Sequence, residues 1–149
     1  MDFSLDEDLV ALQGLAREIF GDLATTERLR EVEATPAAYD EGLWRALGDA
    51  GILGLTVPEE HGGAGLDLAA LAVVLEEQGR TVAPVPVWPH AVAALALAGR
   101  PDLLPGVADG SSRITLALEE YAADAAAPRT SAGLAGDGWR ISGTKAVVP

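Results

Sequence analysis

The chain has 149 residues, and 49% of them are hydrophobic, which is enough for one ordinary domain, or for one small domain and part of another. Its formal net charge of −13 argues against nucleic acid and anionic membranes as partners, because phosphate groups attract basic surfaces. Since the chain has no cysteine, disulfides, thiolate metal sites and cysteine nucleophiles are excluded.

Apolar residues at helical spacing predict two helices in the first third of the chain. The first runs from about residue 5 to residue 20, and Ser4 with Glu7 forms the capping box at its start. The second begins near Thr35-Pro36, a favourable N-cap and first-turn pair, and ends at Gly51. Its buried stripe is predicted to contain Tyr39, Leu43, Leu47 and Ala50.

Two further helices are predicted before residue 100. The third is capped by Asp67 and runs to Gly79. The proline-rich stretch TVAPVPVWP, residues 81–89, is expected to be extended. The fourth helix, residues 89–98, is apolar nearly all round and is therefore expected to be central. The stretch PDLLPGVADG, residues 101–110, allows one more short helix.

From Arg113 the apolar pattern changes to a period of two, which predicts strands. Residues 113–119 form one, the pair Asp137-Gly138 joins two more in a hairpin, and residues 144–148 begin another. The predicted fold is mainly α: an N-terminal helical bundle followed by a truncated antiparallel β segment. Truncation is expected because so few strands would leave their edges unpaired.

The stretch GLTVPEEHGGAGLDL, residues 54–68, joins the second and third predicted helices. It lacks the lysine and Ser/Thr of a phosphate loop and the spacing of a dinucleotide fingerprint. Taken alone, it is interpreted as a connection in which glycines supply positive φ angles. Pro58 and the glycines at 62, 63 and 65 are predicted to set this turn.

Residues 43–80, LWRALGDAGILGLTVPEEHGGAGLDLAALAVVLEEQGR, resemble the N-terminal helical domain of the acyl-CoA dehydrogenases. The stretch GRTVAPVP resembles a divergent branch whose members often work as one of two unlike subunits, and DGWRISGTKAVV resembles the hairpin that opens the middle β-domain. The resemblance implies two domains: residues 1–112 as the helical domain of the acyl-CoA dehydrogenase type, and residues 113–149 as the start of the middle β-domain.

The resemblance also implies an activity. Enzymes of this family hold FAD and remove hydrogens from the α and β carbons of an acyl-CoA thioester, with a glutamate as base that most members carry in a later helical domain. The implied function is therefore the N-terminal portion of an FAD-dependent oxidoreductase, contributing surface to the acyl pocket and to a subunit interface. The glycine stretch is expected to help shape the substrate channel without touching the reacting atoms.

The flavin signatures of the family are replaced in this chain. By position, its T-E-P-x-A-G-S-D motif falls on residues 119–126, where Glu120 matches but Glu119 replaces the threonine, and Ala125 and Ala126 replace the Ser-Asp pair. A second flavin contact, W-x-[ST], falls on Val147 and Pro149. FAD therefore remains an inference from the family, the cofactor-binding residues are unknown, and the isolated chain is expected not to bind flavin.

The remaining candidates are assigned structural roles, so that neither a catalytic nor a metal-binding residue is predicted. His61 and His90 are expected to face solvent or to cap local structure, because zinc needs three or four ligands. Glu76 and Glu77 point about 100° apart on a helix and are interpreted as a solvated face. Three tryptophans are expected in the core or in interfaces: Trp44, Trp88 and Trp139.

Three functions stay open from the sequence. The chain is a piece of an acyl-CoA dehydrogenase, a non-flavin subunit paired with an unlike family member, or a non-enzymatic helical binding module. The expected partners are an acyl-CoA thioester and either further copies of the chain or an unlike subunit. The divergent branch favours bulky thioesters such as sterol-derived or secondary-metabolite ones, by analogy with its members. A cytoplasmic location is expected, because the start is acidic and the longest apolar run, residues 91–98, is far short of the roughly 20 residues that span a bilayer.

Overall fold

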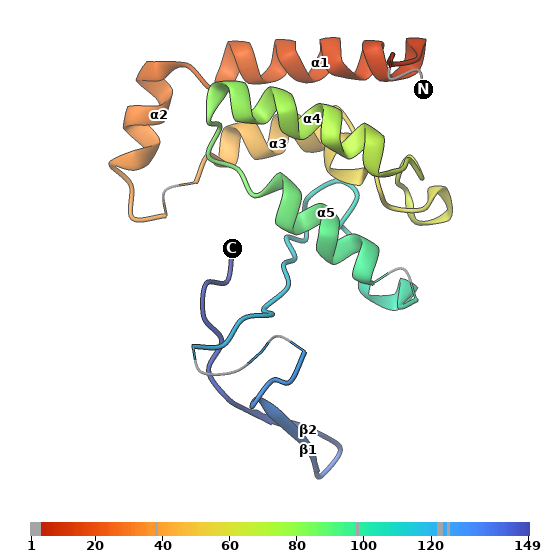
Figure 1. Cartoon of the computed structure of the whole chain (residues 1–149), viewed down its shortest axis with the longest axis vertical. Coiled ribbons are helices and arrows are strands. Elements are labelled where there is room, and N and C mark those ends of the chain that lie inside the picture. Colours follow the sequence, from red (N-terminus) through yellow and green to blue (C-terminus); the bar gives the residue numbers. More distant parts are fainter. Residues whose placement is uncertain (1–3, 38, 98, 122–123, 125) are drawn as a thin grey trace. The chain divides into compact units, whose positions relative to one another are not determined.

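The computed structural model describes residues 4–37, 39–97, 99–121, 124 and 126–149. The chain divides into two compact units, one ending at Ile114 and one beginning at Thr115, which we call the helical unit and the β unit. The predicted fold class is confirmed: five α-helices are followed by a two-stranded antiparallel sheet in the described residues (Figure 1). None of the described helices is long and apolar enough to cross a membrane.

The first helix, α1 (Glu7–Leu23), begins two residues later than a cap at Ser4 would place it. Its N-cap is Asp6, whose carboxylate accepts a hydrogen bond from the Leu9 amide at 2.8 Å, so the predicted Ser4 capping box is wrong. A carboxylate is favoured here because it accepts amide bonds and lies at the positive end of the helix dipole.

The second predicted helix begins later in the structure, and another helix precedes it. An unpredicted helix, α2 (Thr26–Glu33), is capped by Thr25 and escaped detection because its sequence TERLREVE is mostly polar. The Thr35-Pro36 start is wrong, since the Thr35 hydroxyl instead donates to the Val32 carbonyl at 2.7 Å and closes the end of α2. The predicted stripe belongs in part to α3 (Glu41–Asp49), which contains the buried Leu43 and Leu47. Tyr39 precedes this helix and Ala50 is its C-cap, and both are only partly buried.

Asp40 is the true start signal of α3. Its carboxylate accepts from the Leu43 amide at 3.1 Å and is buried, with 2% of the residue exposed. Arg28 of α2 supplies the counter-charge, with Nε 2.7 Å from one carboxylate oxygen and Nη2 3.0 Å from the other. The pKa of Asp40 is lowered chiefly by this guanidinium, so one ion pair both caps α3 and anchors α2.

The next two helices are α4 (Leu68–Thr81) and α5 (Val87–Ala96). Asp67 caps α4 as predicted, accepting bonds from the amides of residues 69 and 70. The prediction of extended chain fails for residues 87–89, because Pro89 occupies the first turn of α5, where a backbone N–H has no helical partner to lose. Of the predicted fourth helix, Ala98 lies outside the described residues.

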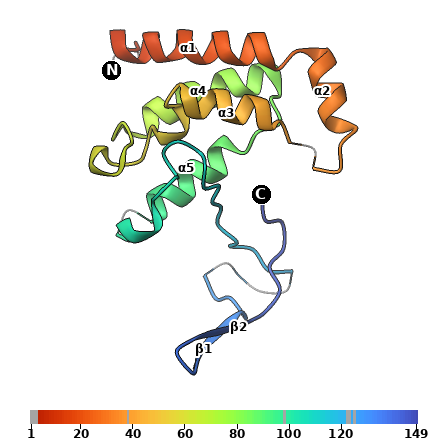
Figure 2. The same ribbon diagram turned by 180° about the vertical axis from the view of Figure 1, so that it is seen from behind.

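The core of the helical unit is formed by side chains of α1, α3, α4 and α5, and α1 lies alongside α4 in both views of the ribbon (Figures 1 and 2). Short 3₁₀ turns, Ile52–Gly54, Glu59–His61 and Pro101–Leu103, complete this unit. Each large apolar side chain buried in such a core contributes about 1.5–3 kcal/mol. The main buried members are Phe20, Leu43, Trp44, Leu47, Leu53, Leu71, Val74 and Val87.

After the last 3₁₀ turn the chain returns across α3, in a stretch that we call the return segment (residues 104–114). Leu104 and Val107 are buried in it, and the indole Nε1 of Trp44 donates to the Gly110 carbonyl at 2.9 Å. Gly110 has a φ of 75°, and a Cβ at this position would lie 2.9 Å from that indole nitrogen. Glycine is therefore required here for both conformation and space.

In the β unit, β1 (Ser131–Ala135) pairs with β2 (Gly138–Ser142), and Leu134 lies opposite Trp139. This confirms the hairpin predicted from Asp137-Gly138. The strands predicted at residues 113–119 and 144–148 are wrong, since neither range is in a strand. These two stretches are joined by a bond from the Ala146 amide to the Glu119 carbonyl at 2.9 Å, which is one contact and not a ladder.

The Trp44 bond to the return segment gives a direct test. We expect Trp44→Phe to lower the free energy of unfolding by about 1–3 kcal/mol, because the buried Gly110 carbonyl loses its donor. The matched control is Trp88→Phe, since Trp88 is 52% exposed, and its effect should stay within about 0.5 kcal/mol. Denaturant unfolding of the two variants checks this, and equal effects would contradict the assigned role of the bond.

Candidate functional site

The predicted turn between α3 and α4, residues 54–68, is a closed loop that we call the glycine loop. Its ends are tied by bonds from the Ala64 amide to the Gly54 carbonyl at 3.0 Å and from the Leu66 amide to the Leu55 carbonyl at 2.7 Å. Gly62 and Gly65 have φ angles of 84° and 62°, as the sequence predicts. Backbone hydrogen bonds therefore close the loop on itself.

Gly63 is required for a different reason from the predicted one. Its φ is not positive, so the prediction of a left-handed conformation is wrong at this position. A Cβ on Gly63 would instead collide with the carbonyl oxygen of Val57 and would lie 2.6 Å from that of Gly54. Close approach of backbone to backbone, which a single sequence does not reveal, makes glycine necessary here.

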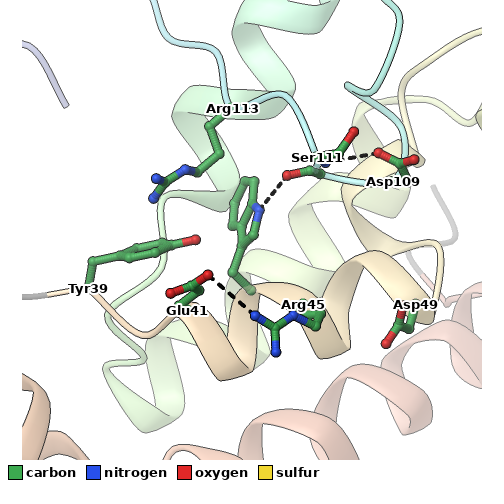
Figure 3. A pocket seen from close by; sticks show the side chains of 9 residues that line it. Tyr39, Glu41, Arg45, Asp49, Asp109, Ser111 and Arg113 are labelled. Atoms are coloured by element: carbon green, nitrogen blue, oxygen red, sulfur yellow. Dashed lines mark hydrogen bonds and ion pairs between the residues drawn. The ribbon is translucent and has the colours of Figure 1, made fainter.

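A cavity of about 410 Å³ opens between α3 and the return segment, and we call it the α3 pocket (Figure 3). Its aromatic lining is Tyr39 and Trp44, and the guanidinium carbon of Arg113 lies 4.4 Å from the Tyr39 ring centroid. On α3, Arg45 pairs with Glu41 at 3.3 Å. Figure 3 shows these side chains facing the same space as Asp49, Asp109 and Ser111.

The charges of the α3 pocket are mixed. Burial raises the pKa of Tyr39, and the nearby Arg113 opposes that shift. The pKa of Asp109 is lowered by a hydrogen bond from the Ser111 amide, 2.9 Å long. With two arginines and three carboxylates on its walls, the pocket presents donors and acceptors but no single sign of charge. Its chemistry suits polar recognition.

A second cavity, of about 270 Å³, lies where the glycine loop meets the end of α3. His61 lines it beside Gly62, Asp49 and Asp109, and the histidine is partly exposed, in keeping with the predicted loop position. Within the described part of the chain, no three His, Cys, Asp or Glu side chains are grouped so that they could hold a metal ion.

His90 and Glu77 are buried, contrary to the prediction for each. His90 is 1% exposed, and its Nε2 lies 2.9 Å from the Val107 carbonyl oxygen. Glu77 is 2% exposed and forms a two-pronged pair with Arg17 of α1, at 2.8 and 3.2 Å. The pKa of Glu77 is lowered chiefly by Arg17, while its neighbour Glu76 remains on the surface. Both groups are therefore structural.

The three tryptophans divide between core and surface. Trp44 is buried as predicted and makes an edge-to-face contact with the His90 ring at 4.9 Å. Trp88 and Trp139 are 52% and 69% exposed, so the described chain does not place them in its core. Their assignment to interfaces with other chains stays a prediction.

In the β unit, Glu120 is the centre of a polar cluster. Its carboxylate accepts from the amides of Arg129 and Thr130 at 2.7 and 3.0 Å and from the Thr130 hydroxyl at 2.6 Å. Lys145 completes the cluster at 2.8 Å. The Lys145 and Thr130 bonds are the main reasons why the pKa of Glu120 falls to about 2. The Glu120 carboxylate thereby joins residues 129–130, which precede β1, to Lys145, which follows β2.

The positions that correspond to flavin contacts do not fit a flavin ring. The Glu119 side chain is exposed and presents a carboxylate, which is an acceptor, where the family motif has a hydroxyl donor. Val147 offers no polar side-chain atom, and Pro149 has neither a hydroxyl nor a backbone N–H. Ala125 lies outside the described residues, while Glu120 is already occupied. The donor set therefore gives no support for flavin binding by these residues.

The chain is similar to known proteins, both in a family profile and in a curated relative. The family profile described as acyl-CoA dehydrogenase, N-terminal domain, matches residues 6–111. Acyl-CoA dehydrogenase FadE27 of Mycobacterium tuberculosis (strain ATCC 25618 / H37Rv) is 35% identical, and the match covers 99% of this chain and 41% of the relative. The chain thus spans about two fifths of the length of that relative.

Two solved structures are similar over nearly the whole chain. The Tcur3481-Tcur3483 steroid ACAD G363A variant is 61% identical with a TM-score of 0.88, and the match covers 96% of this chain and 41% of that one. The ChsE4-ChsE5 complex from Mycobacterium tuberculosis is 34% identical with a TM-score of 0.87, covering 99% and 42%.

The close approach at Gly63 predicts a steric effect. We expect Gly63→Ala to lower the free energy of unfolding by about 1–3 kcal/mol, because the methyl group forces two fixed carbonyls apart. The control is Gly14→Ala in α1, where a Cβ meets nothing within 4 Å and should stabilise the helix by about 0.5–1 kcal/mol. Thermal and denaturant unfolding measure both variants; a neutral Gly63→Ala would disprove the steric role.

The Glu120 cluster predicts a pH dependence of the β unit. Since the pKa of Glu120 is lowered from 4.5 to about 2, its stabilising effect is complete above 4.5 and is lost as the pH falls toward 2. Glu120→Gln should weaken the hairpin at neutral pH and flatten this dependence. Amide NMR signals of β1 and β2 across the titration give the measurement, with the exposed Glu119→Gln as control. If the β1 and β2 signals kept the same pH dependence in Glu120→Gln, the cluster would be excluded as its cause.

Proposed function

The chain belongs to the acyl-CoA dehydrogenase family, and we propose that it acts as the N-terminal part of an oxidoreductase that dehydrogenates acyl-CoA thioesters. The observation that carries this proposal is the match of the helical unit to the family's N-terminal domain over residues 6–111. The 61% identity to a steroid acyl-CoA dehydrogenase supports it.

We assign this chain a role in shaping the substrate pocket and a subunit interface. Dehydrogenation needs a base for the α-proton and an acceptor for the β-hydride. The buried carboxylates of the helical unit, Asp40 and Glu77, are both neutralised by arginines and are unsuited to act as that base. In this proposal the glycine loop, closed by its backbone bonds, forms one border of the substrate channel. The domain limits 1–112 and 113–149 and a cytoplasmic location belong to the same proposal.

The substrate that we propose is a bulky, steroid-derived thioester. The support is the 61% identity to a protein that is named as a steroid ACAD. Each of the two similar structures is named after a pair of proteins, Tcur3481-Tcur3483 and ChsE4-ChsE5, which supports assembly of this chain with an unlike subunit.

A second candidate function is that of a flavin-free subunit whose partner carries the FAD. The observation that favours it is the donor set of the β unit, where Glu119, Val147 and Pro149 stand in place of flavin-binding groups. FAD itself is supported for the family by a solved acyl-CoA dehydrogenase complexed with FAD from Bacillus anthracis. In this version the present chain contributes shape and contacts while all redox chemistry lies in the other subunit.

A chimera separates the two candidates. The matching N-terminal part of FadE27 is replaced by this chain, and the product is purified alone and with a co-expressed unlike family subunit. For the first candidate we expect the chimera alone to hold flavin and to reduce an artificial electron acceptor with a steroid-derived acyl-CoA. For the second, flavin and turnover should appear only with the unlike subunit, and Glu119→Thr in the chimera is the matched variant that restores a hydroxyl. The 149-residue chain should be colourless in both cases.

Two results would contradict these proposals. A stoichiometric flavin band in the isolated chain would contradict the assignment of its β unit. Absence of turnover in every combination, with folding verified by circular dichroism, would refute the proposed activity.

A further inference from the structure

His90 connects α5 to the return segment at two residues, Val107 and Ile114. Its Nε2 lies 2.9 Å from the Val107 carbonyl oxygen, and its Nδ1 lies 3.4 Å from the Ile114 amide nitrogen. The Trp44 ring contacts it edge-on, with the two ring planes at 88°. Ile114 is the last residue of the helical unit, so this imidazole holds the point at which that unit ends.

The two partners define the state of the ring. A carbonyl oxygen can only accept, so Nε2 must carry a proton; an amide can only donate, so Nδ1 must be bare. The imidazole is therefore neutral and in the Nε2–H form. A second proton would have to sit on Nδ1, where it would face the Ile114 N–H and would break that hydrogen bond.

The surroundings of His90 do not favour a charged ring. On α5 it is the sole ionisable group, and α3 presents the Trp44 indole to it. On the return segment the ionisable side chains are Asp109, engaged with the Ser111 amide, and Arg113, stacked on Tyr39. Two further elements neighbour α5. The 3₁₀ turn Ile52–Gly54 has no ionisable side chain. The ionisable side chains of α4 are Glu76, Glu77 and Arg80, which form ion pairs with one another and with Arg17. Burial lowers the pKa of His90 from its ordinary value of 6.5, and the bond to the Val107 carbonyl opposes that shift.

We propose that His90 is a proton-sensitive latch: its neutral ring pins Ile114 and closes the end of the helical unit, and its protonated ring releases that end. The His90 ring binds a proton more readily when the segment is released, because the ring is then solvated. The latch is therefore closed above the ordinary pKa of 6.5 and opens as the pH falls below it toward the lowered value. Release frees the Ile114 amide first, and the Trp44 bond to Gly110 remains to hold the middle of the return segment.

Amide exchange of the full chain, followed by NMR, tests this latch. The protection factor of Ile114, corrected for intrinsic exchange, should fall by up to about tenfold per pH unit below 6.5. The Val74 amide in the core of α4 should keep its protection over the same range. Ring nitrogen shifts of His90 report the tautomer directly, and we expect the Nε2–H form at pH above 6.5.

Three variants complete the test. His90→Phe retains an aromatic ring but removes both bonds, so Ile114 should be unprotected at every pH while the core stays folded. His90→Gln offers one donor and one acceptor that do not titrate, and should make the protection of Ile114 independent of pH. His61→Gln is the matched control and should behave like the parent chain. If His90→Phe fails to fold, the parent chain and His90→Gln still decide. A pH-independent Ile114 in the parent chain, or a neutral ring in the Nδ1–H form, would overturn the proposal.

Discussion

The helical unit depends on how closely the return segment can approach α3. Backbone meets backbone at two glycines: a Cβ at Gly48 of α3 would collide with the Asp109 carbonyl, and one at Gly54, in the 3₁₀ turn that follows, would lie 3.0 Å from the carbonyl oxygen of Ala108. Because no side chain intervenes, the Trp44 indole reaches the Gly110 carbonyl and the His90 ring reaches Val107 and Ile114. The α3 pocket exists because the same segment forms one of its walls.

Two buried carboxylates show how an acidic chain assembles a helical core. Asp40 and Glu77 are each about 2% exposed, and each is paired with an arginine whose side chain is partly in solvent, 43% exposed for Arg28 and 61% for Arg17. A buried charge is tolerated only when it is paired and hydrogen-bonded, and removing one partner is far more damaging than losing a surface pair. Arg17 thereby joins α1 to α4, and Arg28 joins α2 to the start of α3. These carboxylates hold the bundle together.

The β unit separates a structural role from a cofactor role within one short stretch. Glu120 is the position that matches the family motif, and its carboxylate is fully used by Arg129, Thr130 and Lys145. The neighbouring positions that would face a flavin offer no suitable donors. A hairpin start held by a carboxylate can therefore persist in a chain whose flavin contacts have been replaced.

The sequence by itself determined the family, the mainly helical fold and the elements with strong local signals. Asp67 marks α4, and Asp137-Gly138 marks the hairpin, because capping and tight turns depend on residues close together in the chain. Tertiary structure alone decided the burial of Glu77 and His90 and the need for glycine at position 63. Each of these depends on a group that is distant in sequence or brought close by folding: Arg17 lies 60 residues from Glu77, and Ile114 lies 24 residues from His90. A single sequence states which residues are present, but the burial and pairing of a charged or polar side chain are fixed only when the remote segments that cover it are in place.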